Sequence, residues 1–340
     1  MREFRAPGRV NLIGDHTDYN EGFVLPVAID LECVVRATRR NDATVNVRWH
    51  EADDRSASYV DGVVLALDRR GRPAIGVDAE VASTVPVGSG LSSSAALEVA
   101  LALALCDATG FELPQAELAL ACQEAEQLAT GVPCGVMDQL ASLAGRAGCA
   151  LLIDCRSLEV EPIPIPASLE LVVVHSGLPR TLAGSAYAER RASCERVAGE
   201  LGLAALRDAT VEQVANDPRA RHVVSENARV LRAAAMLRAG DGGALGRLLH
   251  ESHASLRDDF EVSTPELDVL AEALESAGAL GARLTGAGFG GCVVALADRG
   301  SAETIAARAT ADYRSATGFE PVAYLCHAVD GAGRSERSGR

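Results

Sequence analysis

The sequence predicts an α+β fold with mixed sheets and helices. Strand-like and helical segments follow one another without the regular β–α alternation of a doubly wound sheet. With 48% hydrophobic and 23% charged residues, the 340-residue chain has the composition of a globular protein and room for two domains. The stretch Pro162-Ile-Pro-Ile-Pro166 cannot form a central strand, because proline donates no backbone hydrogen bond. We therefore expect an N-terminal domain over residues 1–165 and a C-terminal domain over residues 166–329.

Apolar spacing predicts the elements of each half. Residues 23–38 and 44–49 are rich in strand-forming residues and flank a charged break, which predicts a β-hairpin. Further strands are expected at 75–81, 149–154, 169–175, 280–285, 292–297 and 321–327. Helices are expected at 58–68, 93–108, 114–128, 137–144, 184–201, 225–239, 242–254, 265–277 and 301–316. Residues 330–340 have nothing apolar beyond Ala332, so we expect a disordered tail.

The charge of the chain narrows the classes of function. A formal net charge of −15 argues against a general surface for nucleic acid or for anionic membranes. The chain contains no lysine, so all 32 of its Lys and Arg residues are arginine. A Walker-A lysine, a Schiff-base lysine and the lysine of protein kinases are therefore excluded.

The cysteines and the N-terminus bear on the compartment. Nine cysteines without a Cys-x-x-Cys pair, most of them among apolar neighbours, predict reduced buried thiols and no metal ligation. The N-terminus lacks the apolar core of a signal peptide, and no apolar run has the length of a membrane span. We expect a cytoplasmic protein with small-molecule substrates, as a monomer or weak homodimer.

Residues 8–26 place hydrogen-bonding groups of every type in one turn-rich segment. Its polar side chains include Arg9, Asp15, His16, Asp18, Tyr19 and Asn20. A core strand has no use for so many polar groups, since each buried one needs a partner. The segment resembles the sugar-binding loop of galactokinases, in the GHMP small-molecule kinase superfamily. This resemblance implies that Asp15, His16 and Asp18 bind sugar hydroxyls and that Arg9 faces the reacting phosphoryl group.

A loop of glycine and serine, from Val85 to Ala96, follows the strand at 75–81 and opens a long helical pattern. Gly88 and Gly90 allow a tight turn, and Ser92–Ser94 can cap the helix start, where free N–H groups favour an anion. A capped helix after a glycine turn is the plain alternative. The string resembles the second GHMP motif. That implies an ATP-binding loop made of Pro86, Gly88, Ser89, Gly90, Leu91, Ser92, Ser93, Ser94 and Ala95.

Two carboxylates, Glu126 and Asp138, stand twelve residues apart. Pro133 and Gly135 break the helix between them, so a hairpin can bring both to one site. Phosphoryl transfer needs an acid/base carboxylate and a magnesium ligand, but spacing alone favours a solvated Glu126 and a helix-capping Asp138. The segment resembles the galactokinase stretch with the catalytic Asp. This implies Asp138 as the base, Glu126 and Ser94 as ligands of Mg²⁺, and the Gly135 backbone at the sugar.

Two further segments resemble galactokinases. Residues 284–292 hold four glycines in six residues, which indicates positive φ or close backbone approach, and they are similar to the third GHMP motif. Ala287 stands there where galactokinases usually have Gly. Residues 180–187 are similar to another galactokinase segment. This similarity implies that Tyr187 contacts the sugar and that Arg180 lies near the reacting groups. Trp49, His50 and the remaining histidines form no metal spacing, and we interpret them as ordinary surface or core residues.

The four segments stand in galactokinase order. The resemblance implies a two-domain GHMP kinase fold with its active site in the inter-domain cleft. It also implies transfer of the ATP γ-phosphate, with Mg²⁺, to the anomeric hydroxyl of α-D-galactose. Asp138 would accept the sugar proton, while Arg9 keeps that carboxylate charged. Two departures leave the sugar open: Asp15 stands where Glu is usual, and the chain starts just before the first motif. The alternatives are a GHMP kinase for an amino, deoxy or uronic sugar, and a non-catalytic galactose sensor.

Overall fold

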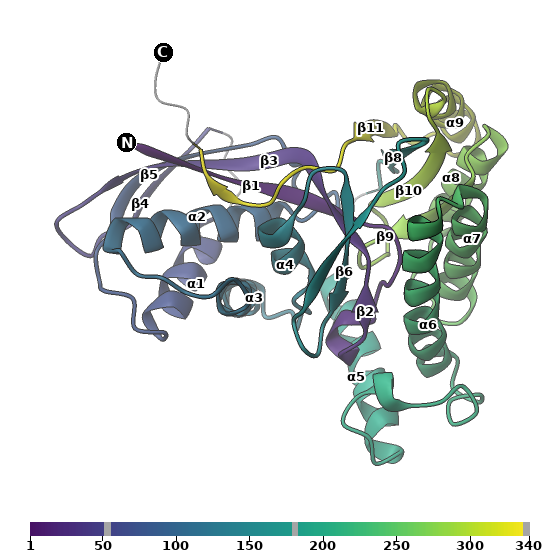
Figure 1. The fold of residues 1–340 in the computed structure, drawn as a ribbon, viewed down its shortest axis with the longest axis horizontal. Helices are drawn as coiled ribbons and strands as arrows, with labels where there is room; N and C mark the ends of the chain where they lie inside the picture. The colour runs from purple at the N-terminus through teal and green to yellow at the C-terminus, as the bar shows by residue number, and fades with distance from the viewer. Residues whose placement is uncertain (51–55, 179–182, 336–340) are drawn as a thin grey trace.

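A computed structural model describes residues 1–50, 56–178 and 183–335 (Figure 1). Its helices are α1 (Ser56–Asp68), α2 (Ser93–Thr109), α3 (Gln115–Thr130), α4 (Met137–Ala144), α5 (Ala183–Glu200), α6 (Pro218–Ala239), α7 (Gly242–Asp258), α8 (Pro265–Ser276) and α9 (Ala302–Thr317). Its strands are β1 (Arg2–Asn11), β2 (Phe23–Val24), β3 (Pro26–Arg39), β4 (Asn46–Trp49), β5 (Val77–Ser83), β6 (Cys149–Asp154), β7 (Val160–Pro164), β8 (Leu169–His175), β9 (Gly281–Thr285), β10 (Cys292–Asp298), β11 (Val322–Cys326) and β12 (Gly333–Arg334). The mixed α+β class is confirmed.

The predicted helices are all present, and most of their ends agree with the apolar spacing. The start of α6 is the largest difference, at Pro218 instead of residue 225. Asp217 caps this helix by accepting a hydrogen bond from the Ala220 amide, and proline at the first helical position loses no hydrogen bond there. The pair Asp217-Pro218 is therefore a sequence signal for the start of α6.

The five-stranded sheet has the order β12-β1-β3-β5-β4. β1, which the spacing did not predict, pairs antiparallel with β3. The expected hairpin of residues 23–38 with 44–49 is wrong, because β5 lies between β3 and β4 and pairs parallel with β4. Gly76 permits this crossover, since a Cβ atom there would lie 1.8 Å from the carbonyl oxygen of Thr44.

The last described residues are attached to the first half of the molecule. The amides of Gly331 and Ala332 donate to the carbonyl oxygens of Gly145 and Ser142, each at 2.8 Å. β12 then pairs antiparallel with β1. The expected disordered tail is therefore wrong for residues 330–335, while 336–340 lie outside the described residues. These contacts are backbone hydrogen bonds, which need no apolar side chains. The lack of apolar residues in this segment therefore did not indicate whether it is ordered.

The four-stranded sheet, of order β11-β8-β10-β9, links the two halves of Figure 1. Alternate residues of β10 enter different cores, as the period of a strand requires. Val294 and Leu296 join the core around α2 and β3, whereas Val293 and Ala295 join the core with α8 and α9. β7 is an outer strand of the sheet β2-β6-β7, which suits its prolines. The boundary after residue 165 stays a prediction.

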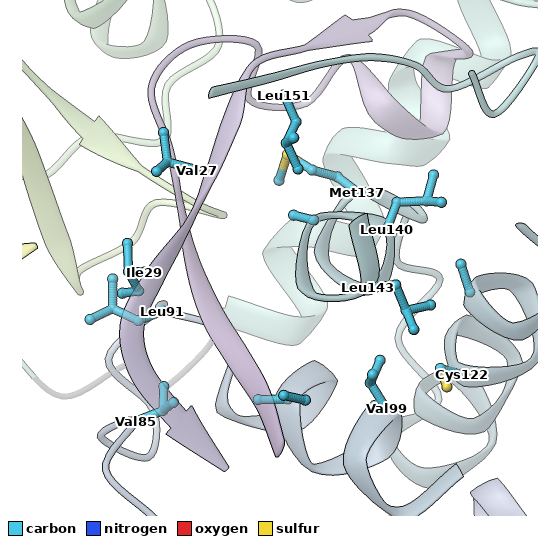
Figure 2. Packing of buried hydrophobic residues seen from close by; sticks show 14 of the residues in the cluster. Val27, Ile29, Val85, Leu91, Val99, Cys122, Met137, Leu140, Leu143 and Leu151 are labelled. Atoms are coloured by element: carbon cyan, nitrogen blue, oxygen red, sulfur yellow. The ribbon is translucent and has the colours of Figure 1, made fainter. Parts of the chain in front are cut away.

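The first core fixes α4, the helix that begins beside Asp138. Figure 2 shows Met137 of α4 beside Leu151 of β6 and Leu143 of α4 pointing toward Val99 of α2, and Leu140 of α4 belongs to the same buried cluster. Five such side chains, each buried, contribute on the order of 1.5–3 kcal/mol apiece relative to exposure. The start of α4 is therefore held on a rigid base.

Candidate active site

One pocket of about 630 Å³ is lined by residues of β1 and the loop after it, β3, β4, β5, α1, the loop before α2, the starts of α2 and α4, α3, α5 and the loop between β9 and β10. A volume of this size is typical of small-molecule sites. Most of the predicted site residues line it: Arg9, Asp15, His16, Asp18, Pro86, Gly88, Gly90, Ser92, Ser93, Ser94, Glu126, Gly135, Asp138 and Tyr187. Ser89, Leu91 and Ala95 are buried beside it, and Arg180 lies outside the described residues.

Arg9 and Asp138 form a two-pronged ion pair at the centre of the pocket. Arg9 donates from Nε to Oδ1 of Asp138 at 2.7 Å and from Nη2 to Oδ2 at 2.6 Å. Its Nη1 donates to the carbonyl oxygen of Gly90 at 2.6 Å, and the Ser92 hydroxyl donates to Oδ2 of Asp138. A β-bulge between Pro7 and Arg9 turns this part of β1 toward the loop. The carboxylate is thus held in one orientation by a charge and a hydroxyl.

The loop before α2 has the backbone conformation expected from its glycines. Gly88 and Gly90 have φ of 73° and 86°. Ser92 shares this left-handed region at 62°, an uncommon conformation for a residue with a side chain. The expected capping by serine is wrong, because Ser92 makes no capping bond and bonds Asp138, while Ser94 donates to Glu126. The first N–H groups of α2 are therefore not capped by Ser92 and can receive an anion.

Glu126 is half-buried, and its carboxylate lines the same pocket as that of Asp138. Its Oε1 accepts from the Ser94 hydroxyl at 2.9 Å and its Oε2 from the Gln139 amide at 2.7 Å. Burial, and next the charge of Asp138, raise the pKa of Glu126. The alternative of a capping Asp138 is wrong, because Val136 holds the cap position of α4 and no side chain caps it. Glu126 is not simply solvated either, since Ser94 and Gln139 both donate to its carboxylate.

Asp15 lies at the base of the pocket in a network of donors. Its Oδ2 accepts from Arg283 at 2.6 Å, and its Oδ1 accepts from Asn11 at 3.0 Å and from the Gly286 amide at 3.1 Å. Burial raises the pKa of Asp15, against the opposing charge of Arg283. Three donors therefore fix the position of this shorter carboxylate.

His16 joins the polar loop to the glycine loop after β9. Its Nδ1 lies 3.0 Å from the Tyr19 hydroxyl and its Nε2 lies 3.3 Å from the carbonyl oxygen of Ala287. Burial, and next the charge of His222, lower the pKa of His16 to about 3, so the ring is neutral at pH 7. All four glycines of the loop have positive φ, but Ala287 does not, which is why alanine is tolerated there.

Asp18 and Gly135 pack directly against each other. A Cβ atom on residue 135 would lie 1.9 Å from Oδ2 of Asp18, so only glycine fits. Burial, and next the charge of Asp138, raise the pKa of Asp18 to about 7. The Tyr187 ring lies beside these groups, with its centroid 5.5 Å from that of His16. These residues form a polar chamber with one aromatic wall.

Comparison with known proteins assigns the family. Residues 2–39 match the galactokinase galactose-binding signature, residues 58–146 match the GHMP kinases N terminal domain, and residues 233–315 match the GHMP kinases C terminal family. A galactokinase from Roseiflexus sp. (strain RS-1) is 49% identical over 359 residues, which cover 97% of this chain and 92% of the relative. The chain belongs to the galactokinase family.

Solved structures agree with the family. The structure of Lactococcus lactis galactokinase complexed with galactose has a TM-score of 0.91 at 34% identity, with 98% of this chain and 94% of that chain covered. L. major mevalonate kinase, in complex with R-mevalonate, shares the fold at a TM-score of 0.71 and 21% identity, with 97% and 96% covered. The predicted two-domain GHMP kinase fold is thereby confirmed for this galactokinase family member.

Several residues of this galactokinase-family site were not predicted from the sequence. Trp49 and His50, interpreted as ordinary residues, line the pocket together with Tyr59. Arg283, which is fully buried, and Asn11 hold Asp15. One signal was available for Arg283, because an arginine inside the apolar strand at 280–285 needs a buried partner. Trp49 offered none, since a lone aromatic residue at a strand end is common.

We expect Asp15→Glu to change sugar selectivity in this galactokinase family member. The longer side chain cannot keep all three bonds, because Arg283 is held by the carbonyl oxygens of Asn11 and Leu12, and the Gly286 amide is part of the backbone. Its carboxylate must therefore move toward the pocket. The measurement is kcat/KM for galactose relative to its 6-deoxy and 2-amino analogues. Ratios that all stay within about twofold, under roughly 0.5 kcal/mol, would place Asp15 away from the sugar.

Proposed function

We propose that the protein transfers the γ-phosphate of ATP to the anomeric hydroxyl of α-D-galactose, giving galactose 1-phosphate and ADP. The observation that carries this proposal is the carboxylate of Asp138, held by Arg9 and Ser92 at the foot of a phosphate loop. Asp138 accepts the proton of the attacking hydroxyl or orients that hydroxyl. Arg9 stabilises the charge that develops on the transferred phosphoryl group.

The loop before α2 binds the phosphates in this proposal. The chain has no lysine, so the N–H groups at the start of α2 and the turns at Gly88 and Gly90 supply the contacts. The apolar lining beyond the loop, with Trp49, Tyr59 and Val81, suits an adenine ring.

Ser94 and Glu126 are the residues that would hold Mg²⁺. Both offer oxygen atoms beside the phosphate loop, and Mg²⁺ is commonly bound by one or two carboxylates together with substrate phosphates and water. Within the described residues, no group of three or more His, Cys, Asp or Glu side chains could hold a metal. The donor set therefore fits a metal that arrives with the nucleotide, and it would neutralise phosphate charge there.

We expect Glu126→Ala to raise the Mg²⁺ concentration for half-maximal rate more than it raises the KM for galactose. Loss of one carboxylate weakens a hard-cation site that has few protein ligands. The comparison is a Mg²⁺ titration of the initial rate at saturating ATP and galactose. An unchanged Mg²⁺ dependence would place Glu126 outside the metal site.

The sugar hydroxyls are bound by Asp15, His16, Asp18, Tyr187 and the backbone of Gly135. This chamber is polar and shaped by a contact that tolerates only glycine at residue 135. A site of this kind rejects a sugar that lacks or inverts a bonded hydroxyl, because its own groups are then left unpaired.

We expect Asp18→Asn to weaken galactose binding and to stabilise the fold at neutral pH. The raised pKa of Asp18, about 7, means that its charged form opposes folding. The protonated form of Asp18 favours folding. This contribution to the free energy of unfolding is complete below about pH 4 and is lost as pH rises through about 7. The melting temperature of the variant minus that of wild type should therefore increase from pH 4 to pH 8, by on the order of 2–4 °C. Asp312→Asn, an exposed change on α9, should show no such trend.

The test of the proposed function is an ADP-release assay with a panel of monosaccharides. Galactose should give the highest kcat/KM, with the phosphate on the anomeric oxygen by phosphorus NMR of the product. A preference for an amino, deoxy or uronic sugar would reassign the substrate. Absence of turnover with every sugar would leave only a binding function.

In the part of the chain that the structure describes, no helix is both long enough and apolar enough to cross a membrane.

A further inference from the structure

A second buried carboxyl group lies behind Glu126. Glu98, on α2, is fully buried, and its Oε2 accepts a hydrogen bond from Nε2 of Gln139 at 3.1 Å. The same nitrogen donates to Oε2 of Glu126 at 2.7 Å. Gln139, on α4, follows Asp138 in the chain and is also fully buried. One amide group therefore joins Glu98 to the carboxylate of Glu126.

The amide of Gln139 has one workable orientation. Its nitrogen carries two hydrogens, and the two carboxyl groups use one each. The reversed amide would set a carbonyl oxygen against Oε2 of Glu126, which is an acceptor, and that oxygen would lose its donor. Since the Ser94 hydroxyl holds Oε1 of Glu126, both oxygens of that carboxylate are fixed.

The remaining atoms of the group indicate that Glu98 is a neutral acid. Within the described chain, Oε1 of Glu98 and Oε1 of Gln139 have no hydrogen-bond partner. A charged carboxylate without a cation is costly at this depth, whereas a carboxylic acid carries an O–H donor. One proton on Glu98 would remove the charge while Oε2 still accepts from Gln139. Burial, and next the charge of Glu126, raise the pKa of Glu98 well above its ordinary value, which agrees.

We propose that Glu98 and Gln139 are positioning residues that orient the Glu126 carboxylate toward Mg²⁺. Neither side chain lines the pocket, so both act through Glu126. The proposal rests on the metal site assigned above to Ser94 and Glu126. Groups that hold a metal ligand in place are worth about 10–100-fold in metal affinity or activity.

The test compares two substitutions of Glu98. Glu98→Gln keeps the size and offers Gln139 both an acceptor and a donor, so half-saturating Mg²⁺ should stay within about twofold of wild type. Glu98→Leu removes both, so half-saturating Mg²⁺ should rise about 10–100-fold, with a much smaller change in the KM for galactose. The rise should appear in the rate and in calorimetric titration of Mg²⁺ with a non-hydrolysable ATP analogue.

Ser142→Ala is the matched control. It removes another buried hydrogen bond of α4, from the Ser142 hydroxyl to the carbonyl oxygen of Pro7 at 2.7 Å, with no link to Glu126. Its Mg²⁺ dependence should equal that of wild type at a similar loss of stability. Gln139→Met is the second variant if Glu98→Leu does not fold, and it should give the same rise in half-saturating Mg²⁺.

An infrared difference spectrum tests the neutral acid without any metal. The wild-type spectrum minus that of Glu98→Gln should contain the carbonyl stretch of a protonated carboxylic acid. The proposal is overturned if that band is absent, if Glu98→Leu keeps the wild-type Mg²⁺ dependence, or if Glu98→Gln behaves like Glu98→Leu. Glu126→Ala separates the two proposals. If it too leaves Mg²⁺ dependence unchanged, the metal site itself is wrong, whereas a rise confined to Glu126→Ala refutes only the positioning roles.

Discussion

Replacing Asp138 by Asn should lower kcat by about 10²–10⁴-fold and leave galactose affinity nearly unchanged. Asn keeps the shape of the side chain and can still accept from Arg9 or Ser92 through one oxygen. It cannot accept a proton from the sugar hydroxyl. The effect should therefore appear in kcat, and galactose binding by calorimetry should change little.

Asp107→Asn is a matched control for that substitution. Asp107, on α2, forms an ion pair with Arg2 at the protein surface, away from the pocket. Exposed pairs of this kind contribute about 0–1 kcal/mol, so kcat should not change. If Asp138→Asn retains more than about a tenth of the wild-type kcat, Asp138 is not the base.

The helices of the fold could be predicted from sequence better than its strand pairing. Helical spacing is local, so the segments of α2, α3 and α4 could be read from a few turns each. The neighbours of a strand are set by contacts far along the chain. The order β3-β5-β4 depends on the close approach of Gly76 to Thr44, and no local pattern announces such a contact.

The candidate site divides in a similar way. The pocket residues that could be predicted were those whose motifs have a fixed order, such as Gly88 and Asp138. The partners of the residues behind them could not be predicted, because those partners lie on other elements. Arg283 of β9 meets Asp15 of the N-terminal loop, and Glu98 of α2 meets Gln139 of α4. Each is a buried polar residue whose role depends on a tertiary contact.

Replacing Arg9 by Met should lower kcat by about 10²–10³-fold, the usual effect of removing one preorganised donor to transition-state charge. Among the pocket-lining residues of the described chain, Arg9 is the single arginine beside four carboxyl residues, Asp15, Asp18, Glu126 and Asp138. The sequence has no lysine to replace it. Arg5→Met, on the same strand in an exposed pair with Glu32, is the control and should keep wild-type kcat.

Arg9→Lys separates charge from geometry. Lysine keeps a positive charge but cannot make the two parallel bonds to Asp138 together with the bond to Gly90. Its kcat should fall between those of wild type and Arg9→Met. Equal kcat values for Arg9→Lys and wild type would show that only the positive charge is required. If Arg9→Met keeps more than about a tenth of the wild-type kcat, Arg9 is not a catalytic residue.

The double variant of Arg9→Met and Asp138→Asn measures how far the two residues act as one unit. If Arg9 works mainly by holding and complementing the Asp138 carboxylate, its loss should matter little once that carboxylate is gone. The double variant should then have nearly the kcat of Asp138→Asn alone, because effects of residues that act together are not additive. If the loss of kcat in the double variant instead equals the product of the losses in the two single variants, Arg9 stabilises the phosphoryl group independently of Asp138. Either result assigns the guanidinium to one of two chemical tasks that its position between Gly90 and Asp138 allows.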